Sequence, residues 1–289
     1  MAAVPTVGVA WRPAVADLLA ELGRSGELTF TEVVAENVAD PAAPPAALAA
    51  LAAADVTVVP HGVTLGLAGA ELPRSHLLGR LAALAERFDS PFVSEHVAFV
   101  RAGGEDGGLH ADVLEAGHLV PPPRTRECLD VLCDNVVRAQ DALPVPLACE
   151  NIAATLRWPE DELDEPAFLT ALVERTGCLL VLDVANLYGT CSAAGTDPHA
   201  QLWRLPLERV AYVHIAGGVA RDGIYLDTHA HPVIEPVADL LADLVSLAPH
   251  PVPVLLERDS AVTADAVTAD LAVVRAAVAR GAAVTDGVQ

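Results

Sequence analysis

Lysine is absent from this sequence, and basic residues of any kind are few. The 17 basic residues face 39 acidic ones, which gives a formal net charge of -22 at pH 7. A field of this sign repels a phosphate backbone instead of attracting it. The composition therefore argues against nucleic acid as a partner.

Long apolar runs are also absent, and we expect no N-terminal leader. No stretch of about 18 consecutive apolar residues is present to cross a bilayer, and residues 1–13 do not join a basic start to a long apolar segment. We therefore expect a cytoplasmic protein with no membrane partner. The five cysteines are odd in number and form no CxxC pair, which argues against a disulfide framework.

What the sequence does contain is a regular alternation of two kinds of segment. Short β-branched runs alternate with Ala/Leu-rich segments of helical periodicity, and eight such βα units can be counted. A length of 289 residues suits one large α/β barrel. We predict a single (β/α)8 TIM-barrel domain over residues 1–289. After its fourth strand, the glycine- and proline-rich residues 101–123 are interpreted as a long lid or binding loop.

The predicted strands end in a common way. Seven of the eight finish with polar residues, which are in order Glu36-Asn37, His61, Glu95-His96, Glu150-Asn151, Asp183 with Asn186, His214 and Glu257. In a (β/α)8 barrel the carboxyl ends of all strands lie on one face, where such enzymes place their chemistry. We therefore expect these side chains to meet in one cavity.

A further polar segment follows the seventh strand. It places Asp227, His229 and His231 at every second position. In an extended backbone alternate side chains project to one face, so this spacing predicts that the three converge. The remaining histidines are interpreted as structural or solvent-exposed: His76, His110, His118, His199 and His250. Exceptions are expected first at His110 and His118, which lie in the long loop after the fourth strand.

Several carboxylates buried together at a barrel mouth are costly unless cations or protons offset them, and a divalent metal is the natural counter-charge. A mixture of imidazole and carboxylate without thiolate suits Fe, Mn or Zn. The candidate ligands exceed the needs of one ion, which predicts two or three metals. They are His61, His96, Glu150, Asp183, Asn186, His214, Asp227, His229 and Glu257.

The ordered motifs HGVTLGLAG, SEHVAF, CENIA, LDVANLYG, HIAGG, DTHAHPV and LLERD resemble those of the multinuclear non-haem iron-dependent oxidases, the family that includes the iron oxidase of methanobactin biosynthesis. The resemblance spans nearly the whole chain. It implies a TIM barrel whose mouth binds two or three irons through His61, His96, Glu150, Asp183, His214, Asp227, His229 and Glu257. Asn186 or His231 would serve a third iron or support the ligands.

The resemblance also implies a reaction. Family members use iron and O2 to oxidise residues, often cysteine, of ribosomally made precursor peptides, commonly with a separate recognition protein. We predict Glu150, Asp183 and His214 as catalytic, and Glu95, Asn151 and His231 as supporting the ligands or contacting substrate. No recognition domain is evident in this chain, so such a partner is expected in trans.

Two positions depart from the family pattern. This chain has Glu95 where the family usually has Asp, and Ala185-Asn186 where it usually has an Asn pair. The first change keeps a carboxylate near the metals but moves it by one methylene. The second removes an amide, which bears more on the substrate pocket and on the third metal site.

Two other functions stay open on the residues alone. A trinuclear-zinc phosphodiesterase or a sugar isomerase of the xylose-isomerase-like type would place similar His, Glu and Asp residues at its strand ends. The net charge of -22 argues against a DNA substrate but not against a sugar. The third possibility is a metal-storing or peptide-binding module without turnover.

Overall fold

The computed structural model describes residues 4–103 and 114–287. Its centre is a closed barrel of parallel strands in the order β1-β12-β9-β8-β7-β4-β3-β2. These strands are β1 (Val7–Ala10), β2 (Phe30–Val34), β3 (Thr57–Gly62), β4 (Val93–His96), β7 (Leu147–Glu150), β8 (Leu179–Asp183), β9 (Val210–Ala216) and β12 (Val254–Glu257). The prediction of a (β/α)8 TIM barrel is confirmed.

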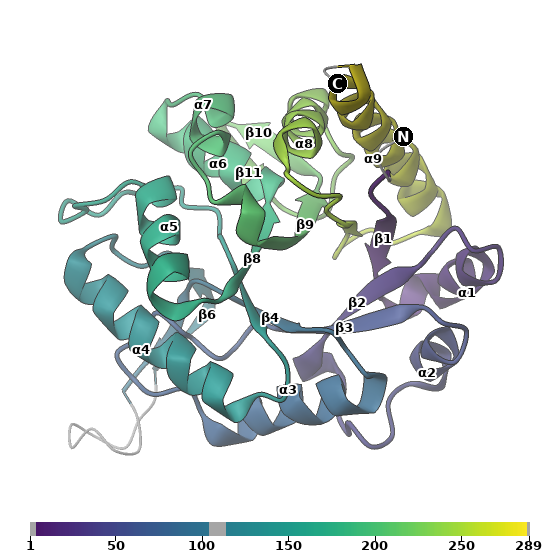
Figure 1. The fold of residues 1–289 in the computed structure, drawn as a ribbon, viewed down its shortest axis with the longest axis horizontal. Coiled ribbons are helices and arrows are strands. Elements are labelled where there is room, and N and C mark those ends of the chain that lie inside the picture. The colour runs from purple at the N-terminus through teal and green to yellow at the C-terminus, as the bar shows by residue number, and fades with distance from the viewer. Residues whose placement is uncertain (1–3, 104–113, 288–289) are drawn as a thin grey trace.

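Helices surround this barrel (Figure 1). They are α1 (Ala16–Arg24), α2 (Ala46–Ala52), α3 (Ser75–Phe88), α4 (Arg126–Ala142), α5 (Glu165–Thr176), α6 (Val184–Ala194), α7 (Pro198–Leu202), α8 (Glu235–Leu247) and α9 (Ala264–Gly287). Among the described residues, no helix is both long and apolar enough to span a membrane.

The alternation of side chains along each strand builds two separate cores. On β8, Leu180 and Leu182 point outward and join the large core under the helices. Val181 points inward and packs with the inward residues of the other strands, which are Ala10, Phe30, Val59, Ala148, Tyr212 and Leu255. This apolar layer fills the barrel interior. Asp183, two residues after Val181, therefore also points inward, above the apolar layer.

The sequence analysis extended the sixth strand to Asn186, but the strand ends earlier. Asp183 is the last residue of β8 and also the N-cap of α6, because its Oδ1 accepts a hydrogen bond of 2.7 Å from the backbone amide of Asn186. Such a cap satisfies one of the free amides at the start of a helix. Because β8 passes directly into α6, no loop separates the two elements, and the sequence analysis missed α6; it also missed α7.

Two hairpins follow the carboxyl ends of β4 and β9. β5 (Phe99–Ala102) pairs antiparallel with β6 (Leu114–Val120), and β10 (Gly218–Arg221) pairs antiparallel with β11 (Ile224–Asp227). Segment 101–123, which was interpreted as an irregular loop, therefore contains strand at both of its described ends. His110 lies outside the described residues.

Candidate metal centre

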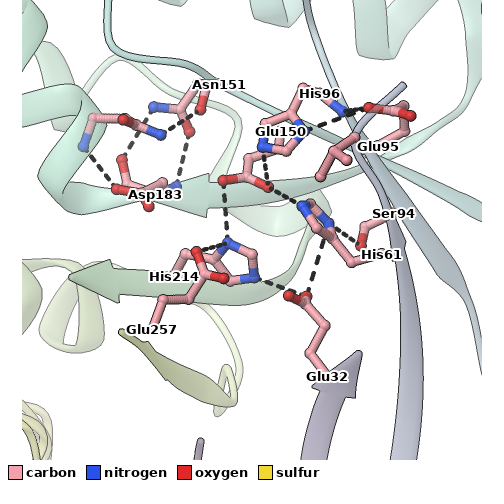
Figure 2. A network of polar contacts seen from close by, with 12 residues as sticks. Glu32, His61, Ser94, Glu95, His96, Glu150, Asn151, Asp183, His214 and Glu257 are labelled. Carbon is pink, nitrogen blue, oxygen red and sulfur yellow. Dashed lines mark hydrogen bonds and ion pairs between the residues drawn. The ribbon is translucent and has the colours of Figure 1, made fainter. Parts of the chain in front are cut away.

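The polar residues at the strand ends meet in three overlapping groups of potential metal donors. Within each group the ligand atoms lie within 4.8 Å of one another. The groups are His61, His96 and Glu150; then Glu150, Asp183, His214 and Glu257; then Asp183, Asp227 and His229. Glu150 belongs to the first two groups and Asp183 to the last two, so the three form one continuous cluster. Figure 2 shows the first two groups.

The donor atoms fit divalent cations. Glu150 Oε2, Asp183 Oδ2 and Asp227 Oδ1 are buried and have no hydrogen-bond partner. A buried acceptor without a partner costs about 1–3 kcal/mol. Each of these oxygens belongs to a residue of the donor groups, and imidazole with carboxylate is the donor set that suits Fe, Mn or Zn. Two or three such ions would satisfy all three oxygens.

Each of the four histidines in the cluster has one ring nitrogen near a cluster carboxylate and the other near a supporting residue. His61 Nε2 lies 3.7 Å from Glu150 Oε2, while its Nδ1 contacts Ser94 Oγ at 2.9 Å. His96 Nε2 lies 3.5 Å from Glu150 Oε2, while its Nδ1 is 3.4 Å from Glu95 Oε1. A metal-binding histidine is commonly held in this way by a partner on its other nitrogen.

The other two histidines follow the same pattern. His214 Nδ1 lies 3.1 Å from Glu150 Oε1 and 3.2 Å from Glu257 Oε2, and its Nε2 is 2.9 Å from Glu32 Oε2. His229 Nε2 lies 2.6 Å from Asp227 Oδ2, and its Nδ1 is 3.0 Å from Asp259 Oδ2. Hydrogen bonds thus fix three of the four rings from the side that faces away from the donor groups, whereas His96 Nδ1 lies near Glu95 without a hydrogen bond.

Proton affinities show how strongly these carboxylates attract positive charge. Burial alone would lower the pKa of His96, but Glu150 and Glu95 outweigh it and raise the pKa to about 9. Burial would raise the pKa of Glu150, but His214 and His96 lower it to about 2. At Asp183, burial and the charges of Asp227 and Glu150 outweigh the nearby histidines and raise the pKa well above the usual value. A metal beside Asp183 would supply the missing charge.

The sequence analysis assumed an extended backbone at Asp227 and His229, but the structure has a turn there. β11 ends at Asp227, and His229 has a left-handed backbone with φ of 51°. This turn brings the His229 ring back onto Asp227. His231 is exposed, and its ring hydrogen-bonds to Thr228 Oγ1 at 2.8 Å. The predicted convergence of three residues is therefore correct for Asp227 and His229.

Contacts from other elements hold this loop. The Arg258 side chain donates to the carbonyl oxygens of Ala230 and His231 and pairs with Asp270 Oδ2 at 2.8 Å. At Gly217 a Cβ atom would lie 1.8 Å from the carbonyl oxygen of His231. Only glycine permits this approach of the two backbones.

The predicted supporting residues brace the donors. The Asn151 side chain makes two hydrogen bonds to the backbone of Asp183, at 2.8 and 3.0 Å. Asn186 Nδ2 donates to the carbonyl oxygen of Asn151 at 3.1 Å, and the side chain lies beside the cavity. Glu95 accepts hydrogen bonds from the backbone amides of Leu65 and His96. The structure therefore places Glu95 and Asn151 behind the donor groups.

The second strand contributes a residue that the sequence analysis missed. Glu36, which was expected in the cavity, instead accepts hydrogen bonds from Val63 and Thr64, and Asn37 is exposed. The inward residue of this strand is Glu32, which is fully buried against His214. The signal for Glu32 in the sequence was an acidic residue inside the otherwise largely apolar strand β2.

A cavity of about 300 Å³ opens beside the donor groups. Its lining is mainly polar and comes from the metal cluster and the loops around it: His96, Leu119, Glu150, Ile152, Ala153, Asn186, Asp227, Thr228, His229 and Asp259. Leu119 comes from β6, so the hairpin after β4 forms part of the wall. A small molecule or one peptide side chain could reach the cluster through this cavity.

Several solved structures share the closed (β/α)8 barrel of this chain. The IOLI protein with a bound zinc atom has a TM-score of 0.63 and 13% identity, and the match covers 95% of this chain and 98% of that one. Endonuclease IV from Thermus thermophilus has a TM-score of 0.61 and 22% identity, covering 95% and 99%. At these identities the likeness shows the fold alone.

Sequence comparison gives the family. Residues 6–279 match the family model of the RiPP precursor modification enzyme MbnB/TglH/ChrH, and this chain belongs to that family. This confirms the resemblance recognised from the motifs. RiPPs are ribosomally made peptides that are modified after synthesis.

Two curated relatives are UPF0276 proteins. A UPF0276 protein of Streptomyces avermitilis is 56% identical over 256 residues, which are 87% of this chain and 50% of the relative. The chain thus spans about half the length of that relative. A UPF0276 protein of Rhizorhabdus wittichii is 35% identical over 81% of this chain and 80% of its own length.

Proposed function

We propose that this protein is a multinuclear non-haem iron-dependent oxidase that uses O2 to modify a residue of a ribosomally synthesised precursor peptide, cysteine being the residue that the resemblance implies. The observation that carries the proposal is the cluster of three donor groups, joined through Glu150 and Asp183, beside an open cavity. Membership in a family of precursor-modifying enzymes supports a peptide substrate.

Bound iron would supply the redox change and the activation of O2. The protein holds the ions through the donors already described. Asp183 and His214 are fully buried, so their catalytic part is to hold metal and not to touch the peptide. The cluster residues that line the cavity, and that a substrate side chain would meet first, are His96, Glu150, Asp227 and His229, and Asn186 lies beside them.

The size of the cavity bears on how the peptide is recognised. About 300 Å³ is at the small end for ligand pockets and suits one side chain with its adjacent backbone. The rest of a precursor would then have to be bound elsewhere. We include in the proposal a separate recognition protein that binds this part and delivers the reacting residue to the cavity.

The test combines metal analysis with product analysis. Protein purified without oxygen should contain more than one iron per chain. When it is given O2 and a precursor peptide encoded beside its gene, with any recognition protein encoded there, the peptide mass should change. The same protein loaded with zinc is the matched control and should leave the mass unchanged.

Two outcomes would point to the other functions. Stoichiometric zinc without iron, together with activity on a phosphodiester or a sugar, would favour the xylose-isomerase-like alternative. Iron that is bound while no peptide is ever modified would favour a storage or binding module.

A further inference from the structure

A chain of buried hydrogen bonds runs beneath the metal cluster and joins two of its histidines. His61 Nδ1 contacts Ser94 Oγ at 2.9 Å, and Ser94 Oγ contacts the Tyr212 hydroxyl at 2.7 Å. The Tyr212 hydroxyl donates to Glu32 Oε2, and the same oxygen lies 2.9 Å from His214 Nε2. Ser94, Tyr212, Glu32 and His214 are all completely buried, and His61 is 3% exposed. Figure 2 shows the two ends of this chain.

The hydrogens in this chain can be placed by counting them. Each hydroxyl carries one hydrogen. Because Tyr212 gives its hydrogen to Glu32, its oxygen can only accept from Ser94. Ser94 has then used its own hydrogen, so His61 Nδ1 must donate to Ser94. At the other end the carboxylate oxygen accepts, so His214 Nε2 carries a hydrogen.

This placement leaves the opposite nitrogens to bind metal. In His61 the free nitrogen is Nε2, which faces Glu150 Oε2 at 3.7 Å. In His214 the nitrogen that would bind metal is Nδ1, which in the metal-free protein donates to Glu150 Oε1 at 3.1 Å, beside Glu257 Oε2 at 3.2 Å, and would lose that hydrogen to a metal. An imidazole binds a metal through its unprotonated nitrogen, and the hydrogen bond on the other nitrogen decides which one that is.

We propose that Glu32 fixes the proton positions of both His61 and His214, the first through Tyr212 and Ser94 and the second directly, and so prepares two donor groups at once. Glu32, Tyr212 and Ser94 are then positioning residues for the metal cluster. The inference rests on the proposed function only in requiring that the cluster binds a divalent metal.

The chain offers variants that separate this role from packing. Glu32→Leu removes the acceptor. Tyr212 can then donate to Ser94, and Ser94 to His61 Nδ1, which moves the His61 proton onto the nitrogen that faces the metals. Glu32→Gln keeps an acceptor oxygen and should restore the original placement. Tyr212→Phe removes only the hydroxyl, because the ring still stacks on Phe92 at 5.3 Å and meets the Phe30 edge.

The measurement is the affinity for Zn²⁺ by competition with a chelator, on variants that are shown to be folded by their melting curves. Glu32→Leu should bind about 10–100-fold more weakly than the parent, which is the usual cost of losing a partner of a metal-binding histidine. Tyr212→Phe should lose less, because His214 keeps Glu32, and Glu32→Gln should recover most of the affinity. Thr31→Val is the matched control, since Thr31 is buried on the same strand but donates only to the Val9 carbonyl.

Proton positions can also be read directly in the zinc-loaded parent by long-range nitrogen–proton NMR. We expect hydrogens on His61 Nδ1 and His214 Nε2, and the opposite assignment for either ring would overturn the inference. Parent-like affinity in both Glu32→Leu and Tyr212→Phe would also overturn it, as would a Glu32→Gln loss equal to that of Glu32→Leu. A parent that binds zinc in this way but never oxidises a peptide would refute the oxidase proposal alone.

Discussion

Asp183→Asn should affect the metal-free and metal-loaded proteins in opposite directions. Asp183 is fully buried, belongs to two donor groups and caps α6. Asparagine keeps the cap, because its Oδ1 can still accept from the amide of Asn186. It removes a carboxylate whose pKa is raised by burial and by the charges of Asp227 and Glu150. The metal-free variant should therefore be at least as stable as the metal-free parent.

With metal the order reverses. A ligand that binds only the native state adds about 2.7 kcal/mol at a free concentration of about 100 times Kd. For a chain of this size about 1 kcal/mol moves Tm by about 2–4 °C, so the parent should gain about 5–10 °C. Asp183→Asn should lose most of that gain, because a neutral amide replaces the carboxylate that two groups share.

The assay is thermal unfolding of each protein, prepared without oxygen, with excess Fe²⁺ and with chelator. Asp197→Asn is the matched control, since Asp197 caps α7 through the amide of His199 at 3.0 Å and lies outside the donor groups. The control should gain as much from metal as the parent. If Asp183→Asn keeps the full gain, or if it melts well below the parent in chelator, the view of Asp183 as a costly shared ligand is wrong.

Three further predictions concern the loop at Asp227 and the cavity. Asp227→Ala and His229→Asn should each lower bound iron and abolish turnover; asparagine is chosen because it tolerates the left-handed backbone of residue 229. The control is His250→Ala, beside the first residue of β9, which should change neither iron content nor turnover. Gly217→Ala should lower the free energy of unfolding, measured with denaturant, by at least about 1–3 kcal/mol and should lower metal content, because the alanine Cβ would collide with the carbonyl oxygen of His231. The matched control is Gly79→Ala, where a Cβ meets nothing within 4 Å; it should stabilise α3 by up to about 1 kcal/mol. Leu119→Ala should raise the KM for peptide and leave bound iron unchanged, as measured by kinetics and metal analysis.

The barrel could be predicted because its strands are short, apolar and regularly spaced. Bounds were most accurate where a helix has clear limits. The periodicity of the sequence predicts helices from about Ser75 to Phe88 and near Glu165 to Thr176, and α3 and α5 span these residues. They were least accurate where β8 passes directly into α6 at Asp183. One residue there is both the end of a strand and the cap of a helix, so no loop composition separates the two elements.

The candidate site was predicted where polar residues end a strand and missed where one lies within it. Glu36 looked like the polar end of the second strand, but β2 ends at Val34 and Glu36 lies in the 3-10 turn Ala35–Asn37. Within β2 the period of two turns Phe30 and Glu32 inward. The hairpin after β9 had a signal that was overlooked. Asp222-Gly223 is a typical two-residue turn, and both residues have positive φ. The left-handed turn at His229 had no comparable signal in the sequence.

The same period of two explains where the partners of the histidines come from. Ser94 precedes His96 and Tyr212 precedes His214 by two residues, so each points into the barrel one layer below the donors. This layer separates the metal cluster from the apolar interior, and Tyr212 itself packs into that interior. Apolar residues in its place would pack equally well, but His61 and His214 would then lose the partners that orient them. The side chains of this layer therefore do two things: they pack on the apolar core of the barrel, and they orient the histidines that would bind metal.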